Sequence, residues 1–121
     1  MLRLLSKQEV NHFTCRGANP YSDRGRYFGI EDTAIARLIK RGWVISEIRD
    51  FFVISEKRRQ GYGRRLLQLL LQEVQTPVVF LTVRQENAPM RCLVESEGFR
   101  NIETIISPIG NEVVFYAKRG L

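Results

Sequence analysis

The sequence predicts an α/β (α+β) fold with a mixed central sheet of about six or seven strands and two main helices packed on it. The first observation behind this prediction is the order of segments at 51–71, where an apolar run, a basic turn with two glycines and a leucine-rich stretch follow one another. The second is the unbroken apolar run at 78–83, which is typical of a buried strand after a helical crossover. The third is a series of short apolar segments before residue 54, which predicts an antiparallel meander.

Length and composition indicate one globular domain over 1–121. The chain has 121 residues, of which 44% are hydrophobic and 26% charged, as in proteins with a buried core. No apolar run reaches the length of a membrane span, and the first residues lack the pattern of a signal peptide. With only two cysteines, Cys15 and Cys92, we expect neither a disulfide framework nor a metal site. These features predict a reduced, cytoplasmic protein.

The first 26 residues predict one strand, one helix and a loop. Residues 2–5 are a short apolar stretch, and the pair Ser6 and Glu9 is a capping-box pattern that predicts a helix over 7–13. Residues 14–26 have the polar, glycine-containing composition of a loop. His12 is the only histidine, and its place beside a phenylalanine favours a packing or surface role over catalysis.

The meander and the second half of the chain follow from alternation and turn residues. We expect strands at 27–30, 34–39 and 43–54, then a helix from about Arg64 whose apolar stripe runs to Val74 before Pro77 stops it. The run at 78–83 is the next strand and is parallel to 43–54. A second helix is expected at 87–97 with Gly98 after its end, and a closing hairpin at 99–106 and 112–118.

The glycine turn predicts an anion-binding site. A helix that begins directly after such a turn presents free backbone N–H groups and its positive dipole end, which favour a phosphate. Gly61 and Gly63 let the backbone approach a ligand closely. We interpret the turn as a pyrophosphate cradle; the alternative is a tight connection beside a solvated basic face.

The charge distribution agrees with a local anion site. The net charge is +6, which implies an anionic partner such as a phosphorylated cofactor, an acidic protein surface or nucleic acid. Five of the basic residues lie within 57–65. This concentration favours one local site over the spread footprint of a nucleic-acid-binding protein.

These motifs resemble those of the GNAT superfamily of acyl-CoA-dependent N-acyltransferases. The central family motif, Arg/Gln-x-x-Gly-x-Gly/Ala, has its counterpart in the segment 58–63, and the apolar Val53 stands eight residues before the first glycine. The second family pattern spaces an asparagine, a leucine and a Gly-Phe pair as here in Asn87, Leu93, Gly98 and Phe99. The resemblance covers about 27–118 and implies the GNAT fold in a compact member.

The resemblance implies acetyl-CoA as co-substrate and assigns its contacts. The backbone at 51–53 would pair with the pantetheine arm and polarise the thioester carbonyl, the amides at 59–64 would hold the pyrophosphate with help from arginine side chains, and Asn87 would meet the pantetheine or cysteamine end. The expected cofactor-binding residues are therefore Phe51, Phe52, Val53, Arg58, Arg59, Gln60, Gly61, Tyr62, Gly63, Arg64 and Asn87.

The resemblance also implies a glutamate on the fourth strand as general base, often acting through water. Glu47 lies fourteen residues before Gly61, a spacing similar to that of the histone-acetylating branch of the family, and is the candidate. The alternative is a surface glutamate paired with Arg49 on the same strand face.

The sequence departs from the family in two places. Where the family often has a tyrosine that protonates the leaving thiolate, this chain has Val94, which has no proton to give. Tyr62 and Cys92 are nearby in sequence, but we expect packing roles for both. Residues 1–26 have room for one helix where the family usually has two, so the acceptor pocket is either an open groove or completed by a second subunit in a homodimer.

We therefore expect an N-acetyltransferase that moves an acetyl group from acetyl-CoA to a primary amine, a protein lysine or N-terminal amine. A small amine is the second acceptor class. From other classes, a non-catalytic acetyl-CoA sensor and a nucleic-acid-binding module remain as alternatives, and both are disfavoured because Glu47 is present where a base is needed. We expect no membrane partner.

Overall fold

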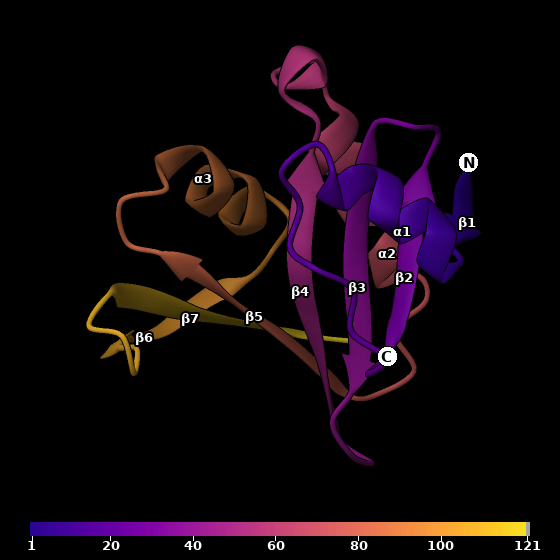
Figure 1. Cartoon of the computed structure of the whole chain (residues 1–121). Coiled ribbons are helices and arrows are strands. Elements are labelled where there is room, and N and C mark those ends of the chain that lie inside the picture. The colour runs from indigo at the N-terminus through magenta and orange to yellow at the C-terminus, as the bar shows by residue number, and fades with distance from the viewer. Residues whose placement is uncertain (121) are drawn as a thin grey trace.

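A single mixed sheet organises the chain in the computed structural model, which describes residues 1–120 (Figure 1). Its seven strands have the order β1-β2-β3-β4-β5-β7-β6. Only β4 and β5 are parallel, and every other neighbouring pair in the described residues is antiparallel. The strands are β1 (Leu2–Leu4), β2 (Arg26–Ile30), β3 (Ala34–Lys40), β4 (Ile45–Val53), β5 (Val78–Arg84), β6 (Arg100–Ile106) and β7 (Glu112–Arg119). The predicted fold class is confirmed.

Helices cover both faces of the sheet, unevenly. These are α1 (Lys7–Thr14), the short 3-10 helix η1 (Ser55–Lys57), α2 (Tyr62–Leu71) and α3 (Ala88–Ser96). Helix α1 packs on one face, over β2 and β3, while α2 and α3 pack on the opposite face (Figure 1). The first six residues of β3 are consequently buried on both sides. The core thus lies around β3 and α2, as the two apolar faces require.

The structure confirms the residues that were predicted to begin α1 and to end α3. At α1, Ser6 Oγ accepts from the Glu9 backbone N–H and the Glu9 carboxylate accepts from the Ser6 backbone N–H, so both halves of the predicted capping box form. Asn87 caps α3 through its side chain. Gly98 follows α3 with a φ of +93°, a conformation that glycine adopts without strain.

Two predicted boundaries are wrong. Helix α2 begins at Tyr62 and ends at Leu71, so Val74 lies beyond it, because the N–H groups of residues 72–74 turn to carbonyls three residues back. Val74 is nevertheless buried in the core that the apolar stripe predicted. Strand β4 begins at Ile45 rather than Trp43, since Trp43 and Val44 lie in an exposed turn.

None of the helices in residues 1–120 has the length and apolar character needed to cross a membrane.

Candidate functional site

A cleft opens where β4 and β5 separate. The two strands pair only at their beginnings, from Ile45 with Val78 to Glu47 with Phe80, and then diverge. The space between them is a cleft of about 650 Å³. Its walls are the later parts of β4 and β5, the start of α3, and the β6–β7 loop with Pro108 and Ile109. The divergence of the two parallel strands thus creates this cleft.

The edge of β4 that faces this cleft offers backbone hydrogen-bonding groups. Beyond Glu47, β4 has no strand partner on the β5 side. On its other side it carries a bulge, because Arg37 pairs with Arg49 and Ile35 with Phe52, which leaves two residues of β4 opposite one of β3. Asp50, in the bulge, has a φ of +54°. Phe51 lines the cleft, whereas Phe52 packs towards α1.

The amino-terminal end of α2 lies where the sequence predicts the cradle. Gly61 is the cap residue with a φ of +88°, and a Cβ at this position would meet no atom within 4 Å. Arg65 is the first residue of this turn whose N–H reaches a carbonyl four residues back, that of Gly61. The N–H groups of Tyr62, Gly63 and Arg64 are therefore left for a ligand by the geometry of the helix start. At Gly63 a Cβ would lie 3.6 Å from the Leu93 and Phe51 side chains, an ordinary van der Waals distance, so packing alone does not require glycine at this position.

The arginines around the cradle divide into tethered and free side chains. Arg58 Nε donates to the Val53 carbonyl at 2.9 Å, and its guanidinium lies over the Phe52 ring. Arg64 Nη1 donates to Ser96 Oγ at the end of α3 and to the carboxylate of Glu97, the next residue, both at 2.7 Å. Arg59 and Arg65 are exposed, and no ion pair involves either of them in residues 1–120. Of the predicted phosphate-binding side chains, Arg59 is thus available, while Arg58 and Arg64 fix the loop. Gln60 donates to the Glu56 carbonyl at 3.1 Å.

Helix α3 brings Asn87 and Met90 to the cleft. Both residues line it, and the Asn87 carboxamide oxygen accepts the Met90 N–H at 3.3 Å. Val94, at the position of the family tyrosine, is fully buried in the core and cannot reach a leaving group. Tyr62 packs at the edge of the core, and Cys92 is exposed on α3 rather than packed.

Glu47 lies at the vertex where β4 and β5 part, and its contacts include the ion pair of the alternative interpretation. Its carboxylate lies 3.8 Å from Arg49 Nε. A closer partner, Arg41, reaches Glu47 Oε1 with Nη2 at 2.7 Å and with Nε at 2.9 Å. The residue is 8% exposed. The structure therefore places a nearly buried, ion-paired carboxylate beside the cleft, although it does not line the cleft itself.

A buried ion pair behind the bulge was missed in the sequence. Arg37 Nε lies 2.9 Å from Asp50 Oδ2, with both side chains 8% exposed. The N–H at Arg37 Nε is not directed at this oxygen, so the contact is ionic rather than a hydrogen bond. Asn19 donates to the other Asp50 oxygen at 2.9 Å. The sequence signal for this pair is that Arg37 and Asp50 each lie within a largely apolar strand. Charged groups in such buried positions are usually paired.

A second polar network lies under α3. The Tyr116 hydroxyl donates to Glu95 and accepts from Arg91 Nε at 3.1 Å. Burial raises the pKa of the Tyr116 hydroxyl above its ordinary value; the hydrogen bond to Glu95 adds to this, and the one from Arg91 opposes it. The network joins β7 to α3 and does not line the cleft.

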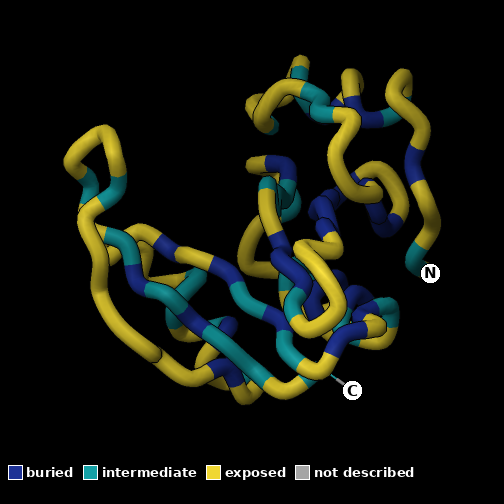
Figure 2. The backbone as a smooth tube through the Cα atoms, turned by 90° about the horizontal axis from the view of Figure 1, so that it is seen from below, coloured by how far each residue is buried: buried dark blue, intermediate teal, exposed yellow. Residues whose placement is uncertain are grey.

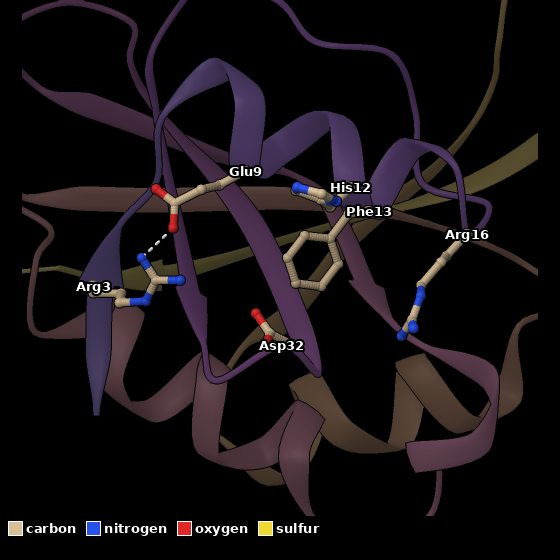
Figure 3. A pocket seen from close by; sticks show the side chains of 6 residues that line it. All are labelled: Arg3, Glu9, His12, Phe13, Arg16 and Asp32. Carbon is tan, nitrogen blue, oxygen red and sulfur yellow. Dashed lines mark hydrogen bonds and ion pairs between the residues drawn. The ribbon is translucent and has the colours of Figure 1, made fainter.

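A smaller hollow of about 270 Å³ lies between α1, β1 and the β2–β3 turn (Figure 3). Arg3 and Glu9 pair at one end of it (Figure 3). His12 extends from α1, Arg16 from the turn after α1, and Asp32 from the β2–β3 turn. It shares no lining residue with the β4–β5 cleft. His12 is exposed here, as expected of a surface residue.

Cleft and cradle together fit an acyl-CoA molecule. The open side of Gly61 and the free N–H groups suit a pyrophosphate. The unpaired edge of β4 suits the amide groups of a pantetheine arm, which can pair with a strand as another strand would. This combination of sheet and site defines an acyl-CoA-dependent transferase.

Sequence comparison leads to the same class. The sequence model described as the acetyltransferase (GNAT) family matches residues 11–99. The chain therefore belongs to the GNAT acetyltransferase family, and it is an enzyme of the acyl-CoA N-acyltransferase class, which uses acetyl-CoA as acyl donor. Among curated proteins, no sequence matches this chain.

Solved structures of similar fold cover 99–100% of the chain. The ribosomal-protein-S18-alanine N-acetyltransferase from Escherichia coli has a TM-score of 0.78 at 21% identity, covering 99% of this chain and 93% of its own. The spermidine N-acetyltransferase from Vibrio cholerae in complex with CoA and spermine has a TM-score of 0.83 at 17% identity, covering 99% and 95%. Ard1 from Thermoplasma volcanium has a TM-score of 0.80 at 15% identity, covering 100% and 97%. These likenesses confirm the GNAT fold.

Proposed function

We propose that this enzyme transfers an acetyl group from acetyl-CoA to a primary amine of a protein, either a lysine or an N-terminal amine. The observation that carries the proposal is the cleft between β4 and β5, whose unpaired β4 edge leads directly into the free N–H groups of α2. A protein acceptor is favoured because one helix, α1, is the only helix in residues 1–25, which leaves the acceptor side open. One protein of similar fold acetylates ribosomal protein S18.

In this proposal, Glu47 is the general base. The amine must lose a proton before it attacks, and Glu47 takes that proton directly or through a water. The nitrogen then forms a bond to the acetyl carbon, the carbon–sulfur bond breaks, and the thiolate leaves and takes a proton from water. The contacts from Arg41 and Arg49 hold the carboxylate in place at the vertex.

The residues that bind the donor have separate roles. The N–H groups of Tyr62, Gly63 and Arg64 and the Arg59 side chain hold the pyrophosphate, with Gly61 leaving the approach clear. Backbone at Phe51 and Val53 pairs with the pantetheine arm, and Asn87 meets its far end. The enzyme acts in the cytoplasm, in keeping with two free cysteines.

The test is acetyl transfer to a panel of peptides and small amines, followed by mass spectrometry. We expect wild-type enzyme to acetylate at least one peptide amine, and Glu47→Gln to lower kcat by about 100-fold, as for loss of a general base. Glu73→Gln is the matched control, since it makes the same substitution at a carboxylate that does not line the cleft. An unchanged kcat in a folded Glu47→Gln enzyme would show that Glu47 is structural. A monomer active only on a small polyamine would contradict the protein acceptor.

A further inference from the structure

The sheet face formed by β5, β7 and β6 on the side away from α3 has no helix over it in residues 1–120 (Figure 1). Strand pairing places Phe80, Thr82, Arg100, Glu103, Phe115 and Arg119 on this side, which we call the open face. The alternating residues, such as Leu81 and Tyr116, are buried on the α3 side. None of the six open-face residues is buried.

The open face is continuous with the proposed catalytic group. Glu47 pairs with Phe80 across β4 and β5, so their side chains lie on the same side of the sheet. Arg49, two residues further along β4, is on that side as well and lines the cleft. A polypeptide bound on the open face would therefore reach Glu47 at the border of the face that adjoins β4.

An aromatic pair at the centre of this face provides apolar contact. The rings of Phe80 and Phe115 stack with centroids 5.0 Å apart and planes within 11°. Both side chains are only partly buried, although they are large and apolar. Such a rigid aromatic surface is typical of sites that bind a polypeptide.

Positive charge surrounds the aromatic pair. Arg100 and Arg119 are exposed on the open face, and no ion pair involves either of them in the described residues. At the inner end, Arg41 and Arg49 share the single carboxylate of Glu47. Together with Glu103 and Glu47, these are four arginines and two glutamates, a local excess of two positive charges. Arg84 is on the same side of the sheet, but its charge is paired with that of Glu86.

We propose that the open face binds the acceptor polypeptide, and that this polypeptide has acidic residues beside the amine that is acetylated. The inference rests on the proposed function and names its substrate class. Guanidinium groups bind carboxylates with two parallel hydrogen bonds, and like charges repel, so a cationic polyamine or a basic peptide is disfavoured. The amine is brought to Glu47 while its acidic neighbours lie against Arg100 and Arg119.

The test compares three peptides that share one amine and one length but have acidic, neutral or basic neighbours. We expect kcat/KM for the acidic peptide to exceed that for the basic peptide by at least about tenfold at low salt, and the preference to shrink as salt screens the charges. The double variant Arg100→Glu/Arg119→Glu should lower kcat/KM for the acidic peptide by about tenfold. Lys7→Glu/Gln8→Glu on α1 is a control that adds negative charge away from the open face.

Binding without turnover separates the two proposals. Anisotropy of a labelled acidic peptide, measured with CoA present, should show binding by wild type and its loss in the double variant. Preference for basic peptides or spermidine would overturn the acidic substrate while leaving acetyl transfer in place. Absence of transfer to any amine would overturn the proposed function, and absence of peptide binding would then remove the inference as well. A double variant that changes the mass in solution but not the peptide preference would assign the face to a second copy of the chain.

Discussion

At the residue scale, the two glycines of the turn have different reasons for being glycine. Gly61 has a positive φ and empty space around it, whereas Gly63 has a helical backbone and ordinary contacts for a Cβ at 3.6 Å. Gly61→Ala should therefore lower the free energy of unfolding by about 1 kcal/mol because of backbone strain. Gly63→Ala should leave it unchanged or raise it by up to about 0.5 kcal/mol. Urea denaturation measures both, and equal losses in the two variants would contradict this account.

Tyr116 gives a prediction for pH. Its folded-state pKa is raised, chiefly by burial, so the protonated hydroxyl contributes stability that is fully present below the unfolded pKa of about 10. This contribution is lost as pH rises through the folded-state pKa. Stability of the wild type should therefore fall above about pH 10, and Tyr116→Phe should reduce that fall. Thermal unfolding of both proteins, measured from pH 8 to 11 in steps of about one pH unit, compares them. The same dependence of stability on pH in the two proteins would contradict this role of Tyr116.

At the element scale, we expect the Arg37–Asp50 pair to stabilise the bulge in β4. Removing one partner of a buried ion pair leaves the other charge without compensation. Asp50→Ala should lower the free energy of unfolding by about 3 kcal/mol, and Arg37→Met/Asp50→Ala should recover part of this loss. Chemical denaturation of the two single variants and the double variant measures the coupling. If the double variant is no more stable than Asp50→Ala, the unpaired charge of Arg37 is not the cause of the lost stability.

Elements that depend on local sequence patterns could be predicted, whereas contacts between strands could not. The capping box at Ser6, the helix after Gly61 and the strand at 78–83 are local patterns, and each is present in the structure. The register shift in β4 and the Arg41 contact with Glu47 depend on pairing across the β3–β4 hairpin, which no local pattern encodes. The exposed start at Trp43 likewise could not be told from a strand, because the segment is apolar in sequence.

At the scale of the whole molecule, the outer edge of β6 is free in the described residues. The strand is exposed along its length (Figure 2), and Ile102 and Ile106 are 58% and 64% exposed. An exposed edge strand that carries apolar side chains is a template for pairing with another chain. We predict a homodimer through this edge, measured as mass against concentration in sedimentation equilibrium. Ile106→Lys should shift the distribution to monomer; a wild type that stays monomeric at high concentration would contradict the prediction.

Calorimetric titration of acetyl-CoA tests whether the turn at Gly61 holds the pyrophosphate of this co-substrate. Gly61→Glu places a carboxylate in the open approach, while Gly42→Glu is the matched control, a glycine that also has positive φ and open space but lies in the β3–β4 turn. We predict micromolar binding by wild type and Gly42→Glu, and no detectable binding by Gly61→Glu. Equal binding by all three proteins, or binding by none, would show that the Gly61 turn does not hold the pyrophosphate.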